Sequence, residues 1–454
     1  MAWSYNLDDL AMVLGVEAPL DGNVSFSGVC TDTRKILPGQ LFVALQGDNF
    51  DGNKFAAQAI EAGAAAALVS SANRSGPYLV TDNTLKALQD FAAYHRARFA
   101  IPLFALTGSC GKTSAKDFTT ALLATKYNVI KTLGNLNNEI GCPLSLLAIQ
   151  DDTTFAVIEM GANHVGEIEQ LCKLARPTES AVTMVAPAHL EGFGSVLRVA
   201  AAKSEIMNGL PEGGPFYVNA DDPWCMLMAQ EYTGEKIYFG AEGDVVLRSC
   251  KFDEDGEMLL DIAPIGKLKL PLPIRAQTTN ILLAIAVGLQ HGIDEIERPL
   301  REACKKTTRF KVEQIGPLEV IDDSYNANPA SMIAALETLP DRPAKGKRIA
   351  ALGDMLELGR DAASHHEKVG EAVARCGVSH LFARGEYACA MISGAQAAGT
   401  PHAEVLDTHA SIADAIAAIA EPGDVLLVKG SRGLQMEKVI QELRSKLDPN
   451  TEQG

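Results

Sequence analysis

The segment from Leu106 to Thr113 has the composition of a phosphate-binding loop. It reads LTGSCGKT, follows an apolar run over 101–106 and precedes a helix-like stretch. Backbone N–H groups of such a turn bind phosphate oxygens, the Lys112 ammonium adds positive charge, and the Thr113 hydroxyl could hold a magnesium ion. Leu106 stands where the usual pattern has its first glycine, so this is a compact variant. The residues of the predicted nucleotide site are Gly108, Ser109, Cys110, Gly111, Lys112 and Thr113.

Three further residues lie at or beyond the ends of apolar runs, where a cation or a phosphate could be held. Glu159 ends FAVIE and is either a solvated acid or a magnesium ligand across from Thr113. His189, in VAPAHLEGFGS, is either structural or a ligand for metal or phosphate. Lys203, in AAAKSEI, is either a solvated lysine or a neutral amine that adds carbon dioxide. The resulting carbamate would be a carboxylate-like ligand for a second magnesium ion.

Two asparagine-rich segments could bind polar substrates. GNLNNEIGCP over 134–143 is either a plain turn or a set of amides that supply both donors and acceptors. IDDSYNANPASM over 321–332 joins an apolar run to a helix-like stretch, and a carboxylate at such a strand end often binds ribose hydroxyls. Its candidate residues are Asp323, Tyr325, Asn326 and Asn328. Arg309, which precedes this segment, could reach a phosphate when domains close.

Apolar runs that end in small or polar residues alternate with helix-like stretches from about residue 102 to the C-terminal region. This alternation predicts an α/β fold with parallel sheets. Parallel strands bring their carboxyl ends to one edge, where ligands gather, so the polar residues above should meet there. The stretch 241–273 alternates like antiparallel strands and predicts a hairpin insert. We predict three domains, over 1–100, 101–308 and 309–454.

The composition excludes several classes of protein. With 454 residues, 47% of them hydrophobic and 21% charged, the chain has the make-up of a globular protein of two to four domains. A net charge of −17 argues against a general binder of nucleic acid or anionic membranes. Nine cysteines without a Cys-x-x-Cys pair, and no signal-peptide pattern, favour the cytoplasm. No apolar run reaches the roughly 18–20 residues of a membrane span.

In their order along the chain, these segments resemble the Mur ligases of bacterial cell-wall synthesis, and the resemblance covers nearly the whole chain. TGSCGKT is shared broadly in that family, whereas DDSYNANPASM and LGDMLELG are specific to the member that adds a dipeptide. The resemblance implies a small N-terminal α/β domain for a UDP-sugar, a central ATPase-like domain with a mainly parallel sheet, and a C-terminal Rossmann-like domain.

The same resemblance implies the reaction and its participants. ATP and Mg²⁺ would serve as cofactors, and D-alanyl-D-alanine would be joined to UDP-N-acetylmuramoyl-tripeptide through an acyl phosphate. We expect a cytoplasmic monomer without nucleic-acid partners or a membrane span.

The resemblance further implies roles for individual residues. Thr113 and Glu159 would bind one magnesium ion, while His189 and a carbamylated Lys203 would serve the second. The implied catalytic residues are Lys112, Glu159, His189 and Lys203. The residues implied near the uridine diphosphate are Ser27, Asp32, Thr33 and Arg34. Those implied for the peptide substrates are Asn137, Asn138, Tyr325, Asn326 and Asn328. Those implied for the nucleotide, outside the loop, are Asn280, Arg309 and Asp323.

The chain departs from the family pattern at three places. AQTTN over 276–280 replaces His-Asn-x-x-Asn, so only Asn280 is kept near the expected adenine, and Gln277 could supply an amide. Asn53 stands where histidine is common. Cys110 stands where serine or threonine is usual; a thiolate there would repel phosphate, whereas a neutral thiol is only a small side chain.

Three other functions remain open from the sequence. One is a related ligase that adds a single amino acid, either another Mur ligase or a folylpolyglutamate synthetase-like enzyme. The block from DTR to LFVALQG suits a UDP-sugar and argues against the folate enzyme. A phosphate-loop kinase would make a stable phosphorylated product, and a non-catalytic switch would not need Glu159, His189 and Lys203 together.

Overall fold

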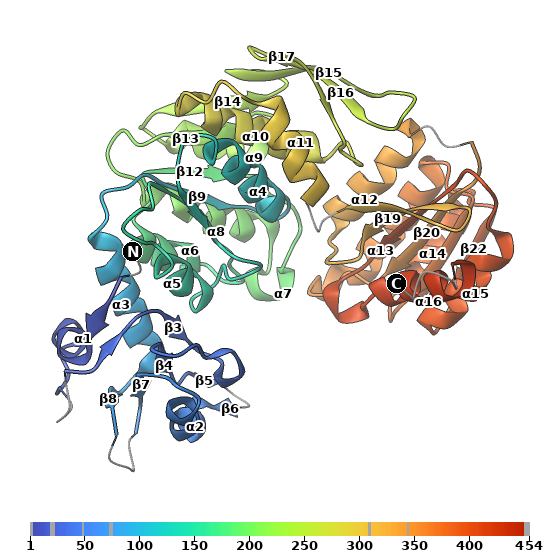
Figure 1. The fold of residues 1–454 in the computed structure, drawn as a ribbon. Coiled ribbons are helices and arrows are strands. Elements are labelled where there is room, and N and C mark those ends of the chain that lie inside the picture. Colours follow the sequence, from blue (N-terminus) through green and yellow to red (C-terminus); the bar gives the residue numbers. More distant parts are fainter. Residues whose placement is uncertain are drawn as a thin grey trace.

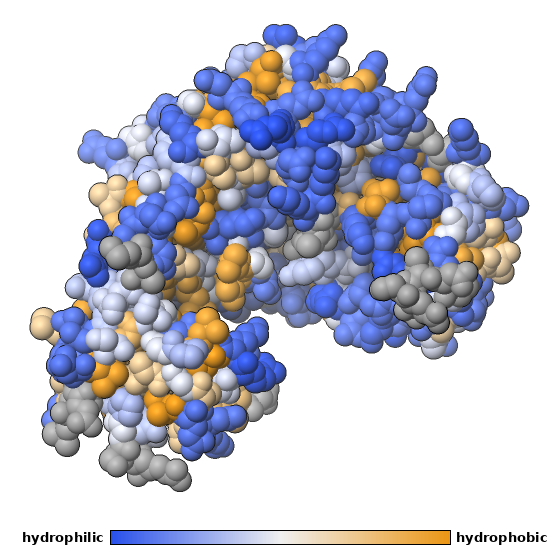
Figure 2. All heavy atoms as spheres, viewed as in Figure 1, coloured by the Kyte–Doolittle hydropathy of each residue, from blue (hydrophilic) through white to orange (hydrophobic). Residues whose placement is uncertain are grey.

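The computed structural model describes residues 3–18, 23–47, 50–71, 76–306, 310–342 and 345–448. Its three larger sheets have four, nine and six strands and follow one another along the chain. Figure 1 shows the central part between an N-terminal part and a C-terminal part, and Figure 2 shows the surface hollowed between these two outer parts. The α/β architecture is therefore the predicted one, while the boundaries after residues 100 and 308 stay predictions.

The N-terminal part is built on a four-stranded parallel sheet in the order β3-β4-β7-β8. Its strands are short and its third strand is fully buried, as the apolar run AALV predicts. Its elements are β1 (Tyr5–Asn6), α1 (Leu7–Leu14), β2 (Ser25–Phe26), β3 (Val29–Cys30), β4 (Leu41–Val43), β5 (Gln46–Gly47), β6 (Phe50–Asp51), α2 (Ala56–Glu61), β7 (Ala66–Val69), β8 (Tyr78–Val80) and α3 (Thr84–Ala97).

The central part contains the nine-stranded sheet, in the order β10-β11-β9-β12-β13-β14-β15-β16-β17. Its elements up to the sixth strand are β9 (Leu103–Thr107), α4 (Lys112–Leu123), β10 (Val129–Lys131), α5 (Gly141–Leu146), β11 (Phe155–Glu159), α6 (Glu167–Ala175), β12 (Glu179–Val182), α7 (Leu190–Phe193), α8 (Val196–Asn208), β13 (Phe216–Asn219), α9 (Pro223–Glu231) and β14 (Lys236–Gly240). The rest are β15 (Val245–Phe252), β16 (Met258–Ala263), β17 (Gly266–Leu270), α10 (Gln277–Gln290) and α11 (Glu297–Lys306).

Strands β10 to β15 pair in parallel, and β15 to β17 pair antiparallel. The predicted insert over 241–273 is thus antiparallel, and it extends the central sheet by three strands instead of standing apart as a hairpin. Alternate residues of β9 enter two different cores: Leu103 and Ala105 face α6 and α8, while Phe104 and Leu106 face α4 and α10. Helices therefore cover both faces of the sheet, which explains why its strands are continuous apolar runs.

The core on the α6 and α8 face continues into the N-terminal part. Trp3, Tyr5 and Phe91 belong to the same buried cluster as Leu103, and the Trp3 indole N–H donates to the Leu147 carbonyl at 2.8 Å. A continuous apolar core gives this junction the packing of a domain interior. The N-terminal and central parts are accordingly one packed body on this side.

The C-terminal part has a six-stranded sheet in the order β18-β19-β23-β20-β21-β22, parallel except for β18. Its elements are β18 (Lys311–Ile315), β19 (Leu318–Asp323), α12 (Pro329–Thr338), β20 (Arg348–Gly353), α13 (Ala362–Arg375), β21 (His380–Arg384), α14 (Ala388–Ala397), β22 (His402–Val405), α15 (His409–Ile419), β23 (Asp424–Lys429) and α16 (Glu437–Leu447). All nine cysteines of the chain are free thiols. Within the described ranges, no helix combines the length and apolarity needed to cross a bilayer.

Candidate nucleotide and metal site

The phosphate loop has the strand–turn–helix setting that its sequence predicts. It joins β9 to α4, which begins at Lys112, and its glycines have φ values that only glycine adopts readily: +146° at Gly108 and +82° at Gly111. A Cβ at Gly108 would lie 1.9 Å from Thr183 Oγ1, and one at Gly111 would lie 2.4 Å from Asn280 Oδ1. Both glycines are therefore required by backbone conformation and by close packing.

Residues that follow β12 hold the loop through hydrogen bonds. The Ser109 amide donates to the Met184 carbonyl at 2.9 Å, and the Ser109 hydroxyl donates to the Ala186 carbonyl at 3.0 Å. Thr183 Oγ1 donates to the Cys110 carbonyl at 2.5 Å. These bonds fix the loop before any ligand arrives, so its backbone N–H groups are preorganised for an anion.

The Cys110 side chain meets the C-terminal part. Asn328 Nδ2 donates to Cys110 Sγ at 2.9 Å, while Asn328 Oδ1 caps α12 by accepting from the Ser331 amide at 2.9 Å. Burial raises the pKa of the Cys110 thiol. Of the two forms considered from the sequence, the structure therefore favours the neutral thiol, which does not repel phosphate.

Other residues of the DDSYNANP segment lie close to this contact. The Asp323 carboxylate pairs with Lys429 Nζ, which also donates to the Asn326 carbonyl at 2.9 Å. The Tyr325 ring is 36% exposed and lies under the Arg432 guanidinium, 6.0 Å from its centroid. Asp323 is thus a buried, paired carboxylate, whereas Tyr325 and Asn326 are the exposed residues of the predicted set.

Glu159 occupies the carboxyl end of β11 and is 2% exposed. Its Oε1 accepts from Asn137 Nδ2 at 2.8 Å, and its Oε2 lies 3.5 Å from the ammonium of Lys116. No hydrogen-bond donor reaches Oε2 within the described part of the chain. A buried carboxylate oxygen without a donor suits a bound cation. Asn138, by contrast, accepts from the Gly141 amide at 2.9 Å and supports the start of α5.

Lys203 and His189 lie on the same side of the site as Lys112. Lys203 is 2% exposed, with its ammonium 5.7 Å from the centroid of the Phe193 ring. Burial, together with the Lys112 charge, lowers the pKa of Lys203 to about 7. His189 precedes α7, and its Nδ1 pairs with the Glu357 carboxylate of the C-terminal part. Burial lowers the pKa of the His189 imidazole as well.

The donor set fits magnesium bound together with an anionic substrate. Among the described residues, no three His, Cys, Asp or Glu side chains cluster as a closed metal cage. Magnesium usually keeps several waters and takes only one or two carboxylates plus substrate phosphates. The donor-free oxygen of Glu159 and the half-buried Thr113, in the first turn of α4, would provide such a partial shell.

The start of α10 borders the phosphate loop. Asn280 approaches Gly111, as described above, and Gln277 is 1% exposed with no partner for either amide atom among the described residues. An unpaired buried amide is costly unless a ligand satisfies it. Gln277 is therefore a candidate for contact with the base of a nucleotide. Arg309, the other predicted nucleotide contact, lies outside the described residues.

The residues predicted for the uridine diphosphate lie apart from this site, in the N-terminal part (Figure 1). The Ser27 hydroxyl donates to the Trp3 carbonyl at 2.8 Å. Asp32 pairs with Arg34 at 2.8 Å, and this hydrogen-bonded guanidinium lowers the pKa of Asp32 to about 2. Thr33 is half-buried beside them. The four residues lie in the N-terminal part, Ser27 before β3 and the other three after it.

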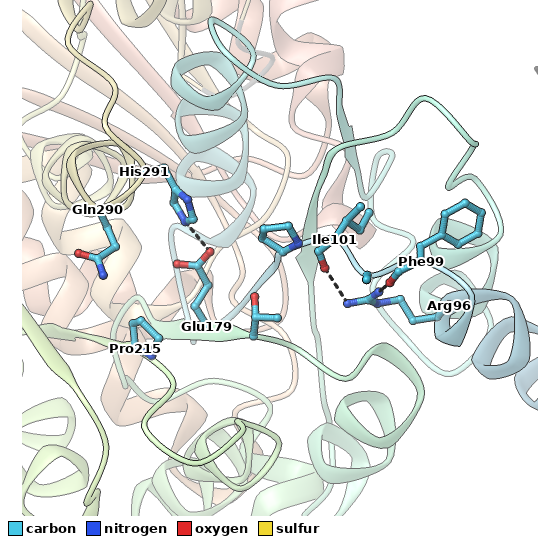
Figure 3. Close-up of a pocket in the computed structure, with 10 residues that line it drawn as sticks. Arg96, Phe99, Ile101, Glu179, Pro215, Gln290 and His291 are labelled. Atoms are coloured by element: carbon cyan, nitrogen blue, oxygen red, sulfur yellow. Dashed lines mark hydrogen bonds and ion pairs between the residues drawn. The ribbon is translucent and has the colours of Figure 1, made fainter.

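A pocket of about 570 Å³ lies at the opposite edge of the central sheet (Figure 3). Both oxygens of its buried Glu179 are already bonded, one by the Tyr217 hydroxyl at 2.6 Å and one by His291 Nε2 at 2.7 Å. The Arg96 guanidinium donates to backbone carbonyls, including that of Ile101 at 3.1 Å. Ligands of parallel sheets bind at the carboxyl ends of strands, whereas this pocket borders their amino ends. It is not the candidate site.

The structure therefore brings the phosphate loop together with Glu159, Asn137, His189, Lys203 and the DDSYNANP segment. Sequence reasoning missed Lys116, Glu357 and Lys429, which contact these residues. Two sequence signals could have found them. Lys116 follows Lys112 by one helical turn, and the other two stand in the LGDMLELG and VKGSRG segments.

Comparison with known proteins gives three matches to family models. The Mur ligase family, catalytic domain model matches residues 25–97, the Mur ligase middle domain model matches 106–288, and the Mur ligase, glutamate ligase domain model matches 308–432. Together these matches extend over most of the chain and follow its three sheets in order.

Individual relatives match over nearly their whole length. The UDP-N-acetylmuramoyl-tripeptide–D-alanyl-D-alanine ligase of Escherichia coli K12 is 38% identical, over 97% of this chain and 98% of the relative. A crystal structure of MurF from Acinetobacter baumannii has a TM-score of 0.89 at 28% identity, covering 98% of this chain and 99% of that one. MurF ligase from Thermotoga maritima in complex with ADP has a TM-score of 0.83 at 28% identity, covering 93% and 98%.

Proposed function

The chain belongs to the Mur ligase family, and from that premise we propose that it joins D-alanyl-D-alanine to UDP-N-acetylmuramoyl-tripeptide with consumption of ATP. The products are UDP-N-acetylmuramoyl-pentapeptide, ADP and phosphate. One observation carries the proposal: the full-length match to a ligase of this name, at 38% identity. The preorganised phosphate loop and the donor-free oxygen of Glu159 support it from the side of the chemistry.

The reaction needs an activated carboxylate because oxide is a poor leaving group. The terminal carboxylate of the tripeptide attacks the γ-phosphorus of ATP, the bond to ADP breaks, and an acyl phosphate forms. The free amine of D-alanyl-D-alanine then attacks the acyl carbon. The tetrahedral intermediate expels phosphate, and the proton lost from nitrogen goes to solvent.

The phosphate loop and the strand ends carry the phosphoryl transfer. Backbone N–H groups of the loop hold the phosphates, and the Lys112 ammonium, now bonded to the Gly108 carbonyl at 2.6 Å, balances charge on the transferred group. Thr113 and Glu159 would hold one magnesium ion, and Asn137 orients that carboxylate. Magnesium, when bound, supplies further charge neutralisation.

His189 and Lys203 would serve a second magnesium ion. An amine with a pKa of about 7 is largely neutral at slightly alkaline pH, which is the form that adds carbon dioxide. The carbamate has the carboxylate-like oxygens that a lysine lacks. His189 contributes a ring nitrogen from the loop before α7.

Residues of all three parts would hold the remaining groups of the substrates. Ser27, Asp32, Thr33 and Arg34 would bind the uridine diphosphate. Asn138, Tyr325, Asn326 and Asn328 would contact the peptide substrates, together with Asn137. Asn280, Arg309 and Asp323 would bind the nucleotide. Docking of the C-terminal part beside the loop would keep water from the acyl phosphate. The free cysteines support the cytoplasm as the place of the reaction, and we expect a monomer.

Phosphate release provides the test. The full chain is incubated with ATP, Mg²⁺ and UDP-N-acetylmuramoyl-tripeptide, with and without D-alanyl-D-alanine, and the product is weighed by mass spectrometry. Release that depends on the dipeptide, with the mass of the pentapeptide, is the expected result. Release with a single amino acid would instead assign a sister ligase. A phosphorylated product without any amine would assign a kinase, and the Lys112→Ala variant controls for contaminating ATPases.

A further inference from the structure

The loop before α7 and the loop after β20 meet across the junction of the central and C-terminal parts. His189 Nδ1 pairs with the Glu357 carboxylate, and the Glu191 amide donates to the Glu357 carbonyl at 3.3 Å. The contact thus involves both the side chain and the backbone of Glu357. Glu357 belongs to the LGDMLELG segment, to which the chemistry above gives no role.

Both residues of this contact have an unusual backbone conformation. His189 has φ of 51° and Glu357 has φ of 63°, in the left-handed region that is unfavourable for residues with a side chain. Such conformations persist where the surrounding structure requires them, and they gather at functional sites. Here the two occur in residues that contact each other from different parts of the chain.

The contact between the two side chains itself adds little stability. The His189 side chain is 36% exposed and that of Glu357 is 56% exposed, and contacts this open to water contribute little to the free energy of folding. That is too little to hold two domains together. The consequence of the contact is therefore to be sought in the imidazole.

A carboxylate beside Nδ1 decides which ring nitrogen of His189 carries the proton. The carboxylate only accepts, so Nδ1 is the donor, and in the neutral imidazole Nε2 then keeps its lone pair. Nε2 with a free lone pair is the form that binds a metal ion, and a carboxylate on the other nitrogen commonly fixes both tautomer and ring orientation.

We propose that Glu357 is a positioning residue for His189, which it holds with Nδ1 protonated and Nε2 available to the metal site. Because Glu357 comes from the C-terminal part, His189 is set in this form only while that part is docked. The inference rests on the proposed function in one respect, since it takes His189 as a metal ligand.

A second contact connects the same docking to the nucleotide. Asn328 of the C-terminal part donates to Cys110 of the phosphate loop, as described above. One docked arrangement therefore contacts the phosphate loop through Asn328 and the second metal ligand through Glu357. The metal site is completed in the same step that covers the nucleotide.

The test compares Glu357→Ala with Glu357→Gln, which keeps an acceptor oxygen, and with Glu371→Ala, an exposed glutamate of α13, as the control. Full-length protein labelled with ¹⁵N-histidine is studied by NMR with ADP present. The signal of His189 is identified by its loss in His189→Gln. We expect an Nδ1–H tautomer in the parent, in Glu357→Gln and in the control, and a tautomer mixture in Glu357→Ala.

Metal binding is measured in the same samples by electron paramagnetic resonance, with Mn²⁺ as the probe and ADP at saturation. Loss of such a partner typically weakens metal binding about 10–100-fold, so the Kd for Mn²⁺ should rise by that factor in Glu357→Ala. Glu357→Gln should remain within about threefold of the parent, on the same scale of effects.

Two results would overturn the proposal. One is an unchanged tautomer in Glu357→Ala with a Kd for Mn²⁺ within twofold of the parent. The other is an equal loss in Glu357→Ala and Glu357→Gln without any change of tautomer, which would indicate a structural ion pair only. Neither readout depends on turnover. If the unmodified protein makes no pentapeptide, the proposed function is refuted. The tautomer of His189 in Glu357→Ala still decides whether Glu357 positions the imidazole.

Discussion

Replacing Lys203 with methionine should stabilise the folded chain at neutral pH while it removes a ligand that the proposed reaction needs. Lys203 is 2% exposed, and no carboxylate lies within ion-pair distance of its ammonium among the described residues. Burial, with the Lys112 charge second, lowers the pKa of Lys203 from 10.5 to about 7. Holding this ammonium in the folded state is therefore unfavourable, and methionine has similar length without the charge.

The magnitude follows from proton linkage. Lowering the pKa of Lys203 by about 3.5 destabilises the folded state by about 5 kcal/mol. This destabilisation is fully present below pH 7, where both the folded and the unfolded chain bind the proton. Between pH 7 and 10.5 the unfolded chain binds more protons than the folded chain, so stability rises with pH. The advantage of Lys203→Met should therefore shrink by about 3 kcal/mol between pH 6.5 and pH 9.5.

Urea unfolding of the full chain in buffers free of carbon dioxide measures this difference. The two tryptophans, Trp3 and Trp224, lie in or against the core that α8 packs into, so their fluorescence reports on the relevant transition. Lys173→Met, which removes a largely exposed lysine of α6, is the matched control and should show no such trend. A Lys203→Met variant whose advantage is equal at both pH values would refute the reasoning.

The same lysine permits a direct test of the carbamate. The neutral amine adds carbon dioxide with loss of one proton, so ¹³C-labelled bicarbonate at pH 8 should produce a carbamate carbon signal in the parent. Lys203→Met should lack that signal. A signal of equal size in both proteins would show that another amine reacts.

Three further predictions concern the nucleotide. Lys112→Ala should lower the rate of phosphate release at least ~100-fold with unchanged thermal unfolding, and near-normal turnover would contradict its role. Gly108→Ala should raise the Kd for ADP ~10-fold or more, measured by calorimetry, because its Cβ would displace Thr183 Oγ1, 1.9 Å away. Gln277→Leu should raise the free energy of unfolding by about 1–3 kcal/mol, since it removes unpaired buried polar atoms, and should weaken ADP binding. Unchanged ADP affinity in this variant would mean that the base binds elsewhere.

The order of the secondary structure could be predicted from the sequence because the sheets are covered on both faces. Strands in such sheets are short apolar runs, and LFALT, FAVIE and DVLLVK are β9, β11 and β23. The insert was predicted as antiparallel, but its attachment to the central sheet was not, since pairing of β14 with β15 depends on how the chain folds back. The local sequence pattern therefore predicts whether a strand is buried on one face or on both, but it does not predict which strands pair with each other.

The phosphate loop was the most predictable part of the site for a similar reason. Its eight residues are contiguous, and their function follows from local backbone geometry. Glu159, His189 and Lys203 were candidates because each follows or adjoins an apolar run. From the sequence alone, however, each could equally be a solvated or structural side chain without a role in the site. Their roles stay predictions. The structure adds that His189 and Lys203 lie close enough to Lys112 for its charge to act on both, and that Glu159 ends the strand that pairs with β9.

By itself, then, the sequence determined the α/β class, the location of the phosphate loop and the family resemblance, because these depend on short segments. Only the tertiary structure decided that Lys203 is buried with a lowered pKa, that burial raises the pKa of the Cys110 thiol and that Glu357 contacts His189. A pKa depends on the solvent and charges that packing places around a group. Residues 168 positions apart meet only when two separately folded parts dock.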